Sequence, residues 1–281
     1  MAAIVMDGKA LAAKIKENVR QQAENFEKKP GLAVILVGDN PASRVYVNGK
    51  KKDCGECGIY SEEHTLPAET TQEELLHLIE QLNDREEIDG ILVQLPLPRH
   101  LNEKEVLLTI RPDKDVDCFH PFNVGQMMIG EDGFKPCTPA GVMRILEEYG
   151  IDPRGKRCVI VGRSNIVGKP QAMLMVQKNA TVTICHTKTA DLAAECRNAD
   201  ILVAAAGRVG LIRGDMVKEG AVVVDVAMNR NEAGKLCGDV VYEEVSEKAA
   251  YLTPVPGGVG PLTRALLMEN TLFAASMHGK I

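Results

Sequence analysis

The sequence feature that most constrains the fold is the stretch from Arg157 to Pro170, which reads RCVIVGRSNIVGKP. Its first five residues, 157–161, are mostly apolar or β-branched, as in a buried parallel strand, and Gly162 ends this run. A helical run opens at Gly168 and extends to Lys178. A strand, a tight glycine turn and a helix form half of a βαβ unit, whose unpaired backbone N–H groups and helix dipole create an anion site.

The segments after this turn predict an α/β fold with a doubly wound parallel sheet. The glycine pattern itself, G-x-S-x-x-x-G over Gly162, Ser164 and Gly168, departs from the usual G-x-G-x-x-G and is a weak signal when taken alone. Further strands are predicted at residues 181–186, 201–206 and 221–226, with a helix at 191–197. In such a sheet the turn usually holds a dinucleotide pyrophosphate. The alternative is an α/β domain whose glycine turn binds no ligand.

The end of the second predicted strand indicates which dinucleotide is bound. An NAD site usually places Asp or Glu there, roughly twenty residues after the turn, to bind the ribose 2′-OH. This chain has His186, Thr187, Lys188 and Thr189 instead, and Arg163 lies within the turn. Hydroxyls and cations without a carboxylate favour a 2′-phosphate, so NADP is the predicted cofactor. The alternative is that Arg163 and Lys188 are merely solvated.

Composition limits the class of protein. The 281 residues suffice for two modest domains or one large one. A net charge of −6 argues against a nucleic-acid binder, because phosphate binding needs a basic face. No segment approaches the roughly eighteen consecutive apolar residues of a membrane span, and the N-terminal segment carries acids and helical periodicity rather than a cleavable signal. We therefore expect a cytoplasmic protein that contacts neither nucleic acid nor membrane.

The eight cysteines could indicate a metal site or disulfides. Cys54 and Cys57 form a C-x-x-C, but no second pair lies at zinc spacing, and the others are scattered, several of them in apolar strands. We expect most of them to be small buried hydrophobic residues and predict no metal. For Cys54 and Cys57, a redox pair is the alternative to ordinary residues at a helix end.

A predicted helix near the N-terminus carries a phenol and an amine on one face. Asn40 and Pro41 supply an N-cap and a first-turn proline after an apolar strand at residues 32–37. Within that helix Tyr46 and Lys50 are four residues apart and therefore share a face. A desolvated lysine can act as a general base, and a tyrosine hydroxyl can orient it or relay its proton. The alternative is a solvated lysine in a basic stretch.

A predicted strand at residues 89–95 stops at Pro96 and leaves Gln94 at its carboxyl end. Ligands of open α/β sheets bind at such ends, and an amide offers both a donor and an acceptor. The alternative is an amide that pairs only with backbone.

Residues 111–125 read as a loop that is dense in charge. Its aspartates, Asp113, Asp115 and Asp117, lack the spacing and the fourth ligand of a cation site. A single carboxylate that binds an aminopyrimidine-like N–H pair fits equally well. Residues 135–141 are the predicted linker into the nucleotide-binding domain, and Thr138 within it is the predicted N-cap.

Three prolines and three glycines make residues 253–263 a stiff loop with close backbone approach. A helix is predicted to follow at residues 262–277 and to return to the first domain.

Six segments, in order, resemble the motifs of the bifunctional methylenetetrahydrofolate dehydrogenase/cyclohydrolase family: YVNGK, ILVQLPLP, KDVDCFHPFNVG, PCTPAG, VGRSNIVGKP and TPVPGGVGPLT. The resemblance covers the chain from about residue 40 to 263. It implies two α/β domains that flank a folate cleft, the second of them Rossmann-like. On this basis residues 1–138 and 262–281 form the expected catalytic folate-binding domain, and residues 139–261 form the expected NADP-binding domain.

The resemblance also implies an activity. The family's enzymes oxidise 5,10-methylene-tetrahydrofolate with NADP to 5,10-methenyl-tetrahydrofolate and hydrolyse this product to 10-formyl-tetrahydrofolate. The resemblance further implies a folate substrate, a homodimer, and a place in the one-carbon metabolism that serves purine, methionine and histidine biosynthesis.

Carried over motif by motif, the resemblance assigns roles to residues. Lys50 of Y-x-x-x-K is the expected general acid/base, Tyr46 is its aromatic neighbour over the substrate, and Gln94 supports Lys50. The expected folate contacts are Asp117 for the pterin ring and the loop residues Gly257, Gly258 and Pro261. The expected NADP site comprises Gly162, Arg163, Ser164, Ile166, Gly168 and Thr187.

The chain departs from the family pattern at a few positions, and three other functions remain open. Cys118 stands where Gly usually follows the aspartate, which opens the backbone angle of that loop to question, and Thr187 replaces a common Ser. A monofunctional dehydrogenase, including one that uses NAD, is disfavoured by retention of Tyr46, Lys50 and Gln94. A non-catalytic nucleotide-binding subunit would be expected to lack Lys50 or Asp117. A shikimate or amino-acid dehydrogenase would be distinguished by its substrates.

Overall fold

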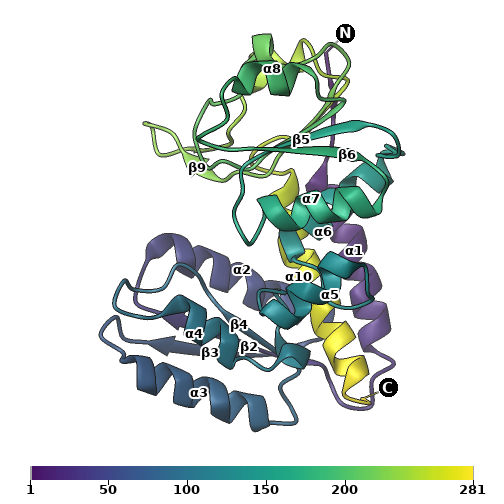
Figure 1. Cartoon of the computed structure of the whole chain (residues 1–281). Helices are drawn as coiled ribbons and strands as arrows, with labels where there is room; N and C mark the ends of the chain where they lie inside the picture. Colours follow the sequence, from purple (N-terminus) through teal and green to yellow (C-terminus); the bar gives the residue numbers. More distant parts are fainter. Residues whose placement is uncertain (1, 281) are drawn as a thin grey trace. The chain divides into compact units, whose positions relative to one another are not determined.

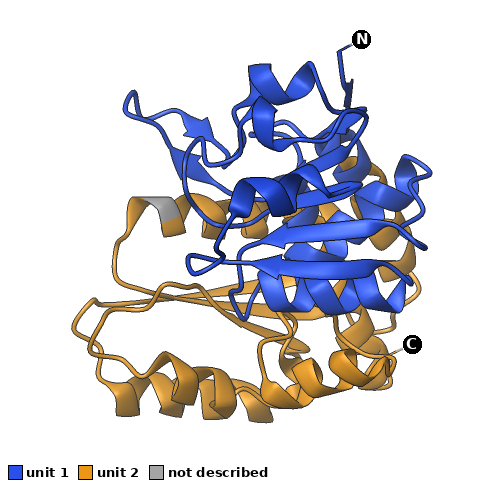
Figure 2. Cartoon of the chain, turned by 45° about the horizontal axis from the view of Figure 1, so that its top comes forward, with its two compact units in different colours: residues 1–12, 136–263 blue, residues 13–135, 264–281 orange. Residues whose placement is uncertain are grey.

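The computed structural model describes residues 2–280, apart from the side chain of Ala42. The chain forms two compact α/β units (Figure 2), with Met1–Ala12 and Pro136–Thr263 in unit 1 and Ala13–Lys135 and Arg264–Ile281 in unit 2. The chain passes from one unit to the other within α1 (Gly8–Ala23), between Lys135 and Pro136, and within α10 (Val259–Met277).

Unit 1 is built on a six-stranded sheet in which all neighbours are parallel, in the order β1-β11-β8-β7-β5-β6. Figure 1 labels two neighbouring strands of this sheet, β5 and β6. Along the chain, β5 (Arg157–Val161) is followed by β6, which pairs with one side of it, and then by β7, which pairs with its other side. The strand order therefore reverses at β5. This arrangement confirms the predicted doubly wound sheet. The other strands are β1 (Ile4–Val5), β6 (Thr181–Cys185), β7 (Ile201–Ala204), β8 (Val222–Asp225) and β11 (Tyr251–Leu252).

Helices and a short hairpin complete unit 1. They are α6 (Cys137–Glu148), α7 (Gly168–Gln177), α8 (Leu192–Arg197), the 3-10 turn η2 (Gly214–Met216), the antiparallel pair β9 (Asn229–Arg230) and β10 (Leu236–Cys237), and α9 (Tyr242–Ser246). The core combines apolar residues of β5, β7 and β8, such as Val159, Leu202 and Val223, with Cys196 from α8.

Unit 1 differs from the sequence expectations at its ends. Residues 2–12 pack with unit 1 rather than with the catalytic domain, because β1 pairs with β11 as an edge strand. Thr138 is not an N-cap, since α6 already begins at Cys137, and its Oγ1 lies 2.9 Å from Thr263 Oγ1. α10 begins at Val259, because Pro261 is tolerated in a first turn, where backbone N–H groups have no intrahelical partner.

Unit 2 is organised around β2 (Gly31–Val37), all seven residues of which are buried. Its parallel neighbours are β3 (Tyr60–Leu66) and β4 (Gly90–Val93), in the order β3-β2-β4. The helices are α2 (Pro41–Cys57), α3 (Gln72–Asp84), α4 (Glu103–Thr109) and α5 (Pro121–Ile129), with the 3-10 turn η1 (Pro112–Lys114). Leu75, Ile79 and Leu82 on one face of α3 pack in a core with Ala33 and Ile35 of β2.

Local signals account for two of these helices. Thr71 and Glu74 form a reciprocal capping box at the start of α3, as the spacing predicts. The prediction of a loop through residue 125 is wrong, because α5 begins at Pro121. Pro121 is preset for a first turn, and His120 Nδ1 accepts the N–H of Phe122 at 3.1 Å.

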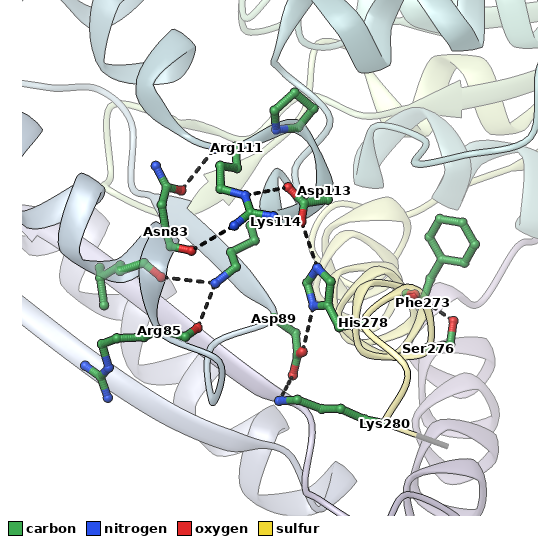
Figure 3. Close-up of polar contacts among 12 residues, drawn as sticks. Asn83, Arg85, Asp89, Arg111, Asp113, Lys114, Phe273, Ser276, His278 and Lys280 are labelled. Atoms are coloured by element: carbon green, nitrogen blue, oxygen red, sulfur yellow. Dashed lines mark hydrogen bonds and ion pairs between the residues drawn. The ribbon is translucent and has the colours of Figure 1, made fainter.

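A polar cluster holds the end of α10 in unit 2 (Figure 3). His278 Nδ1 lies 2.9 Å from Asp89 Oδ1, and its Nε2 lies 3.0 Å from Asp113 Oδ2. Lys280 Nζ donates to Asp89 Oδ2 at 2.8 Å, and the same oxygen accepts the N–H of Gly31 at the start of β2. The predicted return of the terminal helix to the first domain is confirmed. Over residues 2–280, no helix has both the length and the apolar character that a bilayer crossing requires.

The thiols provide a test of this packing. Seven of the eight cysteines are buried free thiols and only Cys237, in β10, is partly exposed. Burial raises the pKa of Cys54 and of Cys57 to about 12, which keeps both in the unreactive thiol form and disfavours a redox pair.

We expect DTNB at pH 8 to label one thiol quickly in the native protein and all eight in denaturant. Cys237→Ser should remove the fast phase, and fast labelling that persists in this variant would contradict the packing.

Candidate active site

Lys50 lies on α2 with its side chain almost withdrawn from solvent, since the residue is 8% exposed. Its Nζ donates a hydrogen bond of 3.0 Å to Oε1 of Gln94. Gln94 directly follows β4, and its backbone N–H donates to Ile35 of β2 at 2.8 Å, so the sheet fixes its position. The structure therefore brings together two of the three predicted catalytic residues.

The backbone determines which end of the Gln94 amide faces Lys50. Gln94 Nε2 donates to the carbonyl oxygen of Leu95 at 2.8 Å, and a carbonyl can only accept. Oε1 is therefore the atom that faces the amine, and it requires one N–H from Lys50. Both a charged and a neutral amine can supply that N–H. In the neutral form, the nitrogen donates an N–H in this bond and does not use its lone pair. A proton acceptor needs that lone pair.

Asp53, one turn after Lys50, ties α2 to two other helices. Its buried carboxylate accepts a hydrogen bond from Lys16 Nζ at 2.9 Å, and Arg264 Nε lies 3.2 Å from its Oδ2. A Cβ at Gly49 would lie 2.0 Å from Arg264 Nη1. The guanidinium thus occupies the space that a larger residue beside Lys50 would need. Neither Asp53 nor Arg264 is among the residues predicted from the sequence. The spacing of three between Lys50 and Asp53 is the one signal that could have indicated Asp53.

Tyr46 lies one turn before Lys50 on α2 and is half-buried, and Asp117 is half-buried in the loop before α5. The residue after Asp117, Cys118, has a φ of 59°, in the left-handed region that glycine adopts without cost. Cys118 therefore keeps a glycine-like backbone angle. Burial and a hydrogen bond from its Sγ to the carbonyl oxygen of Phe134, at 3.3 Å, hold it there.

The other two aspartates of this loop have structural partners. Asp113 Oδ2 lies 2.7 Å from Arg111 Nη2 and also faces His278, while Asp115 is buried and accepts the backbone N–H of His120 at 2.8 Å. No cluster of three His, Cys, Asp or Glu that could hold a metal occurs among the described residues. Asp113 and Asp115 thus serve the loop itself, and the pterin contact expected of Asp117 remains a prediction.

Backbone close approaches shape the glycine turn after β5 in unit 1. A Cβ at Gly162, whose φ is 134°, would lie 2.2 Å from the carbonyl oxygen of Ala205. A Cβ at Gly168 would lie 2.2 Å from the carbonyl oxygen of Gly162. Ser164 Oγ accepts the N–H groups of Val167 at 3.1 Å and of Gly168 at 3.3 Å. Only glycine fits at both positions, and these close main-chain contacts fix the turn that leads into α7.

The side chains around this turn suit a phosphorylated ribose. Arg163 and Ile166 are exposed in the turn, and Thr187 and Lys188 are exposed just after β6. The carbonyl oxygen of Cys185, the last residue of β6, accepts the Gly162 N–H at 2.9 Å, so these residues follow directly beside the turn. The first carboxylate after β6, Asp191, is used as the N-cap of α8 and accepts the Ala194 N–H at 2.9 Å.

The loop at residues 253–258 has the close backbone approach that its composition predicts. Gly257 has a φ of 108°, and its carbonyl oxygen accepts the Lys9 N–H at 3.0 Å. A Cβ at Gly258 would lie 2.6 Å from the carbonyl oxygen of Pro254. Pro261 lies in the first turn of α10. The folate contacts expected of Gly257, Gly258 and Pro261 remain predictions.

Two family models match the chain. The model of the tetrahydrofolate dehydrogenase/cyclohydrolase catalytic domain matches residues 6–117, and that of the NAD(P)-binding domain of the same family matches residues 136–279.

Individual proteins match over the whole length. The Bifunctional protein FolD of Ruminiclostridium cellulolyticum is 58% identical over 281 residues, which cover 99% of each chain. The crystal structure of the bifunctional FolD methylenetetrahydrofolate dehydrogenase/cyclohydrolase of Campylobacter jejuni has a TM-score of 0.96 and 53% identity, covering 98% of this chain and 99% of that one. The FolD of Trypanosoma brucei, in complex with NADP and an inhibitor, has a TM-score of 0.96 and 39% identity over 100% of both chains.

A pair of glycine substitutions in α2 tests the support of Lys50. Gly49→Ala is expected to cost about 1–2 kcal/mol, because the added methyl group displaces the Arg264 guanidinium from a buried carboxylate. Gly55→Ala meets no atom within 4 Å and should stabilise the helix by about 0.5–1 kcal/mol. Urea unfolding measures both. Equal stabilisation in the two variants would contradict the packing of Arg264 against Gly49.

Proposed function

The chain belongs to the tetrahydrofolate dehydrogenase/cyclohydrolase family, and on that premise we propose that Lys50 is the acid/base of a bifunctional folate enzyme. The two reactions are the NADP-dependent oxidation of 5,10-methylene-tetrahydrofolate and the hydrolysis of its 5,10-methenyl product to 10-formyl-tetrahydrofolate. The observation that carries the proposal is the buried Lys50 amine, bonded to an amide oxygen whose orientation the backbone fixes. Both residues lie within the stretch that the catalytic-domain model matches.

The oxidation depends mainly on binding geometry. When bound, NADP accepts a hydride from the methylene carbon of the substrate. Gly162 and Gly168 allow the close main-chain contacts that form the turn, and the N-terminus of α7 would favour the charge of a pyrophosphate beside it. Arg163, Lys188 and the Thr187 hydroxyl supply the charge-assisted contacts that a 2′-phosphate needs. This set of residues supports NADP rather than NAD.

The hydrolysis depends on proton transfer by Lys50. A neutral Lys50 takes a proton from the water that attacks the methenyl carbon. The bond from that carbon to one ring nitrogen then breaks, and Lys50 returns the proton to the departing nitrogen. The remaining hydroxyl proton leaves to solvent as the formyl group forms. The methenyl cation and one water thus give 10-formyl-tetrahydrofolate and one proton.

Gln94, Tyr46 and Asp117 have supporting roles in this proposal. The Gln94 bond fixes the Lys50 nitrogen without using its lone pair, and burial favours a neutral amine. Tyr46 shares a helix face with Lys50 and lies over the substrate. Asp117 binds the N–H groups of the pterin ring, for which a carboxylate is the matching acceptor.

Assembly, location and pathway form a further part of the proposal. We infer a homodimer that acts in the cytoplasm and provides one-carbon units for purine, methionine and histidine biosynthesis. The family membership supports this inference.

A single substitution separates the two activities. Lys50→Met keeps the length of the side chain but removes its nitrogen, so formation of 10-formyl-tetrahydrofolate from the methenyl compound should fall by roughly a thousandfold or more. Binding of methylene-tetrahydrofolate should survive. Lys52→Met, two residues further along the same helix and exposed, is the matched control and should retain full activity. Unchanged hydrolysis in Lys50→Met would refute the role of Lys50.

The cofactor preference depends on charge at the glycine turn. Arg163→Ala should raise the KM for NADP roughly tenfold to a hundredfold, because a charge-assisted contact to the 2′-phosphate is lost, and should change the KM for NAD far less. Arg154→Ala, an exposed position before β5, is the control. Steady-state kinetics with both dinucleotides provides the measurement. An equal rise in both KM values would show that Arg163 does not contact the 2′-phosphate.

A further inference from the structure

Unit 1 contains two buried aspartates to which the proposed chemistry assigns no role. Asp239, just after β10, is fully buried, and Asp225, at the end of β8, is 3% exposed. Asp239 Oδ2 accepts the backbone N–H groups of Ala206 at 2.6 Å and of Gly207 at 3.0 Å, and its Oδ1 accepts that of Arg208 at 2.6 Å. Three successive backbone N–H groups therefore converge on one carboxylate.

Successive N–H groups that converge in this way form an anion-binding nest, a device that other proteins use for phosphates. Here the chain's own carboxylate fills the nest. Residues 206–208 are themselves exposed while their N–H groups point inward to Asp239. The segment therefore offers an outer face to solvent, and charge-assisted hydrogen bonds fix its backbone from behind.

The held segment borders the glycine turn. Ala205, the residue before it, donates its N–H to the carbonyl oxygen of Val161 at 2.8 Å, and its own carbonyl oxygen fills the space that a Cβ on Gly162 would need. β5 and β7 are neighbours, with Val161 paired to Ala204, and the strand order reverses at this point. Dinucleotides bind at such a reversal, outside the carboxyl ends of the strands.

Asp225 in turn places Asp239. Its Oδ1 accepts the Asp239 N–H at 3.2 Å, its Oδ2 accepts the Val240 N–H at 2.9 Å, and a Cβ on Gly238 would lie 1.8 Å from that Oδ2. Burial raises the pKa of Asp225 to about 6, with the nearby Asp239 carboxylate adding to the effect. Asn229 Nδ2 completes the set by donating to Asp239 Oδ1 at 2.9 Å.

We propose that Asp239 is a positioning residue for dinucleotide binding, whose carboxylate holds residues 206–208 in the conformation that borders the glycine turn. Because Asp239 is fully buried, it acts through the backbone of that segment and does not touch the cofactor. This inference rests on the proposed NADP site. It adds to that site a residue distant in sequence from the glycine turn.

Asp239→Asn tests the inference with little change in shape. One of the two acceptor oxygens becomes an NH₂ group, which opposes a backbone N–H instead of accepting from it. The Kd for NADP should rise about tenfold or more. Trypsin should also cut faster after Arg208, as followed by mass spectrometry. Hydrolysis of the methenyl compound, which needs no NADP and whose proposed acid/base Lys50 lies in unit 2, should stay within about twofold of wild type, whereas general destabilisation would lower it as well.

Asp200→Asn is the matched control. Asp200 also holds backbone, since it accepts the Arg157 N–H at 2.9 Å and pairs with Lys218, but it does so at the opposite end of β5. This variant should bind NADP as tightly as wild type and should show the wild-type rate of cleavage after Arg208.

The outcomes separate the inference from the proposed function. A folded Asp239→Asn variant with unchanged affinity for NADP overturns the inference alone, whereas a wild-type protein that binds no NADP overturns both. If Asp239→Asn also loses hydrolysis, Asn229→Ala decides the question, because it loosens the placement of the Asp239 carboxylate by removing one of its donors while the carboxylate itself is kept. A severalfold rise in Kd with faster cleavage after Arg208 supports the inference, and unchanged affinity in Asn229→Ala rejects it.

Discussion

A buried amine must be hydrogen-bonded, and the contact between Lys50 and Gln94 is the interaction on which the catalytic unit depends. Several features of unit 2 serve this contact. The fully buried strand β2 pairs with β4 and thereby sets the position of Gln94 at the strand end, while Asp53 ties the next turn of α2 to α1 and α10. The amide supplies only its oxygen to the amine. In the proposed hydrolysis, this bond holds Lys50 firmly and leaves it able to exchange a proton with the substrate.

In unit 1 the corresponding constraint lies in the backbone. Gly162 and Gly168 permit main-chain contacts too close for any side chain, and these contacts create the turn at the N-terminus of α7. Asp239 holds the neighbouring segment by three N–H groups. The two units thus rely on different means, a side-chain hydrogen bond in one and packed main chain in the other. This difference is why we expect substitutions to separate hydrolysis from dinucleotide binding.

A substantial part of the fold and of the candidate site could be predicted from local patterns in the sequence. The apolar run and glycines of β5 and α7, and the capping residues before α2, are short-range signals, so the sheet and the helix that carries Lys50 could be anticipated. β3, which reads YSEEHTL, could not be predicted from such signals, because it is a polar edge strand that pairs only with β2. The contacts of Arg264 with Gly49 and of Asp239 with Ala206 join residues far apart in sequence, and such contacts exist only once the chain has folded.

A single chain performs both reactions and uses NADP for the first. The most direct test mixes the purified protein with 5,10-methylene-tetrahydrofolate and NADP, and separately with NAD, while methenyl absorbance and 10-formyl-tetrahydrofolate are followed together. Rapid reduction of NADP, slower reduction of NAD and accumulation of the formyl product would agree with a bifunctional, NADP-dependent enzyme. Reduction that stops at the methenyl compound, or equal use of both dinucleotides, would contradict it.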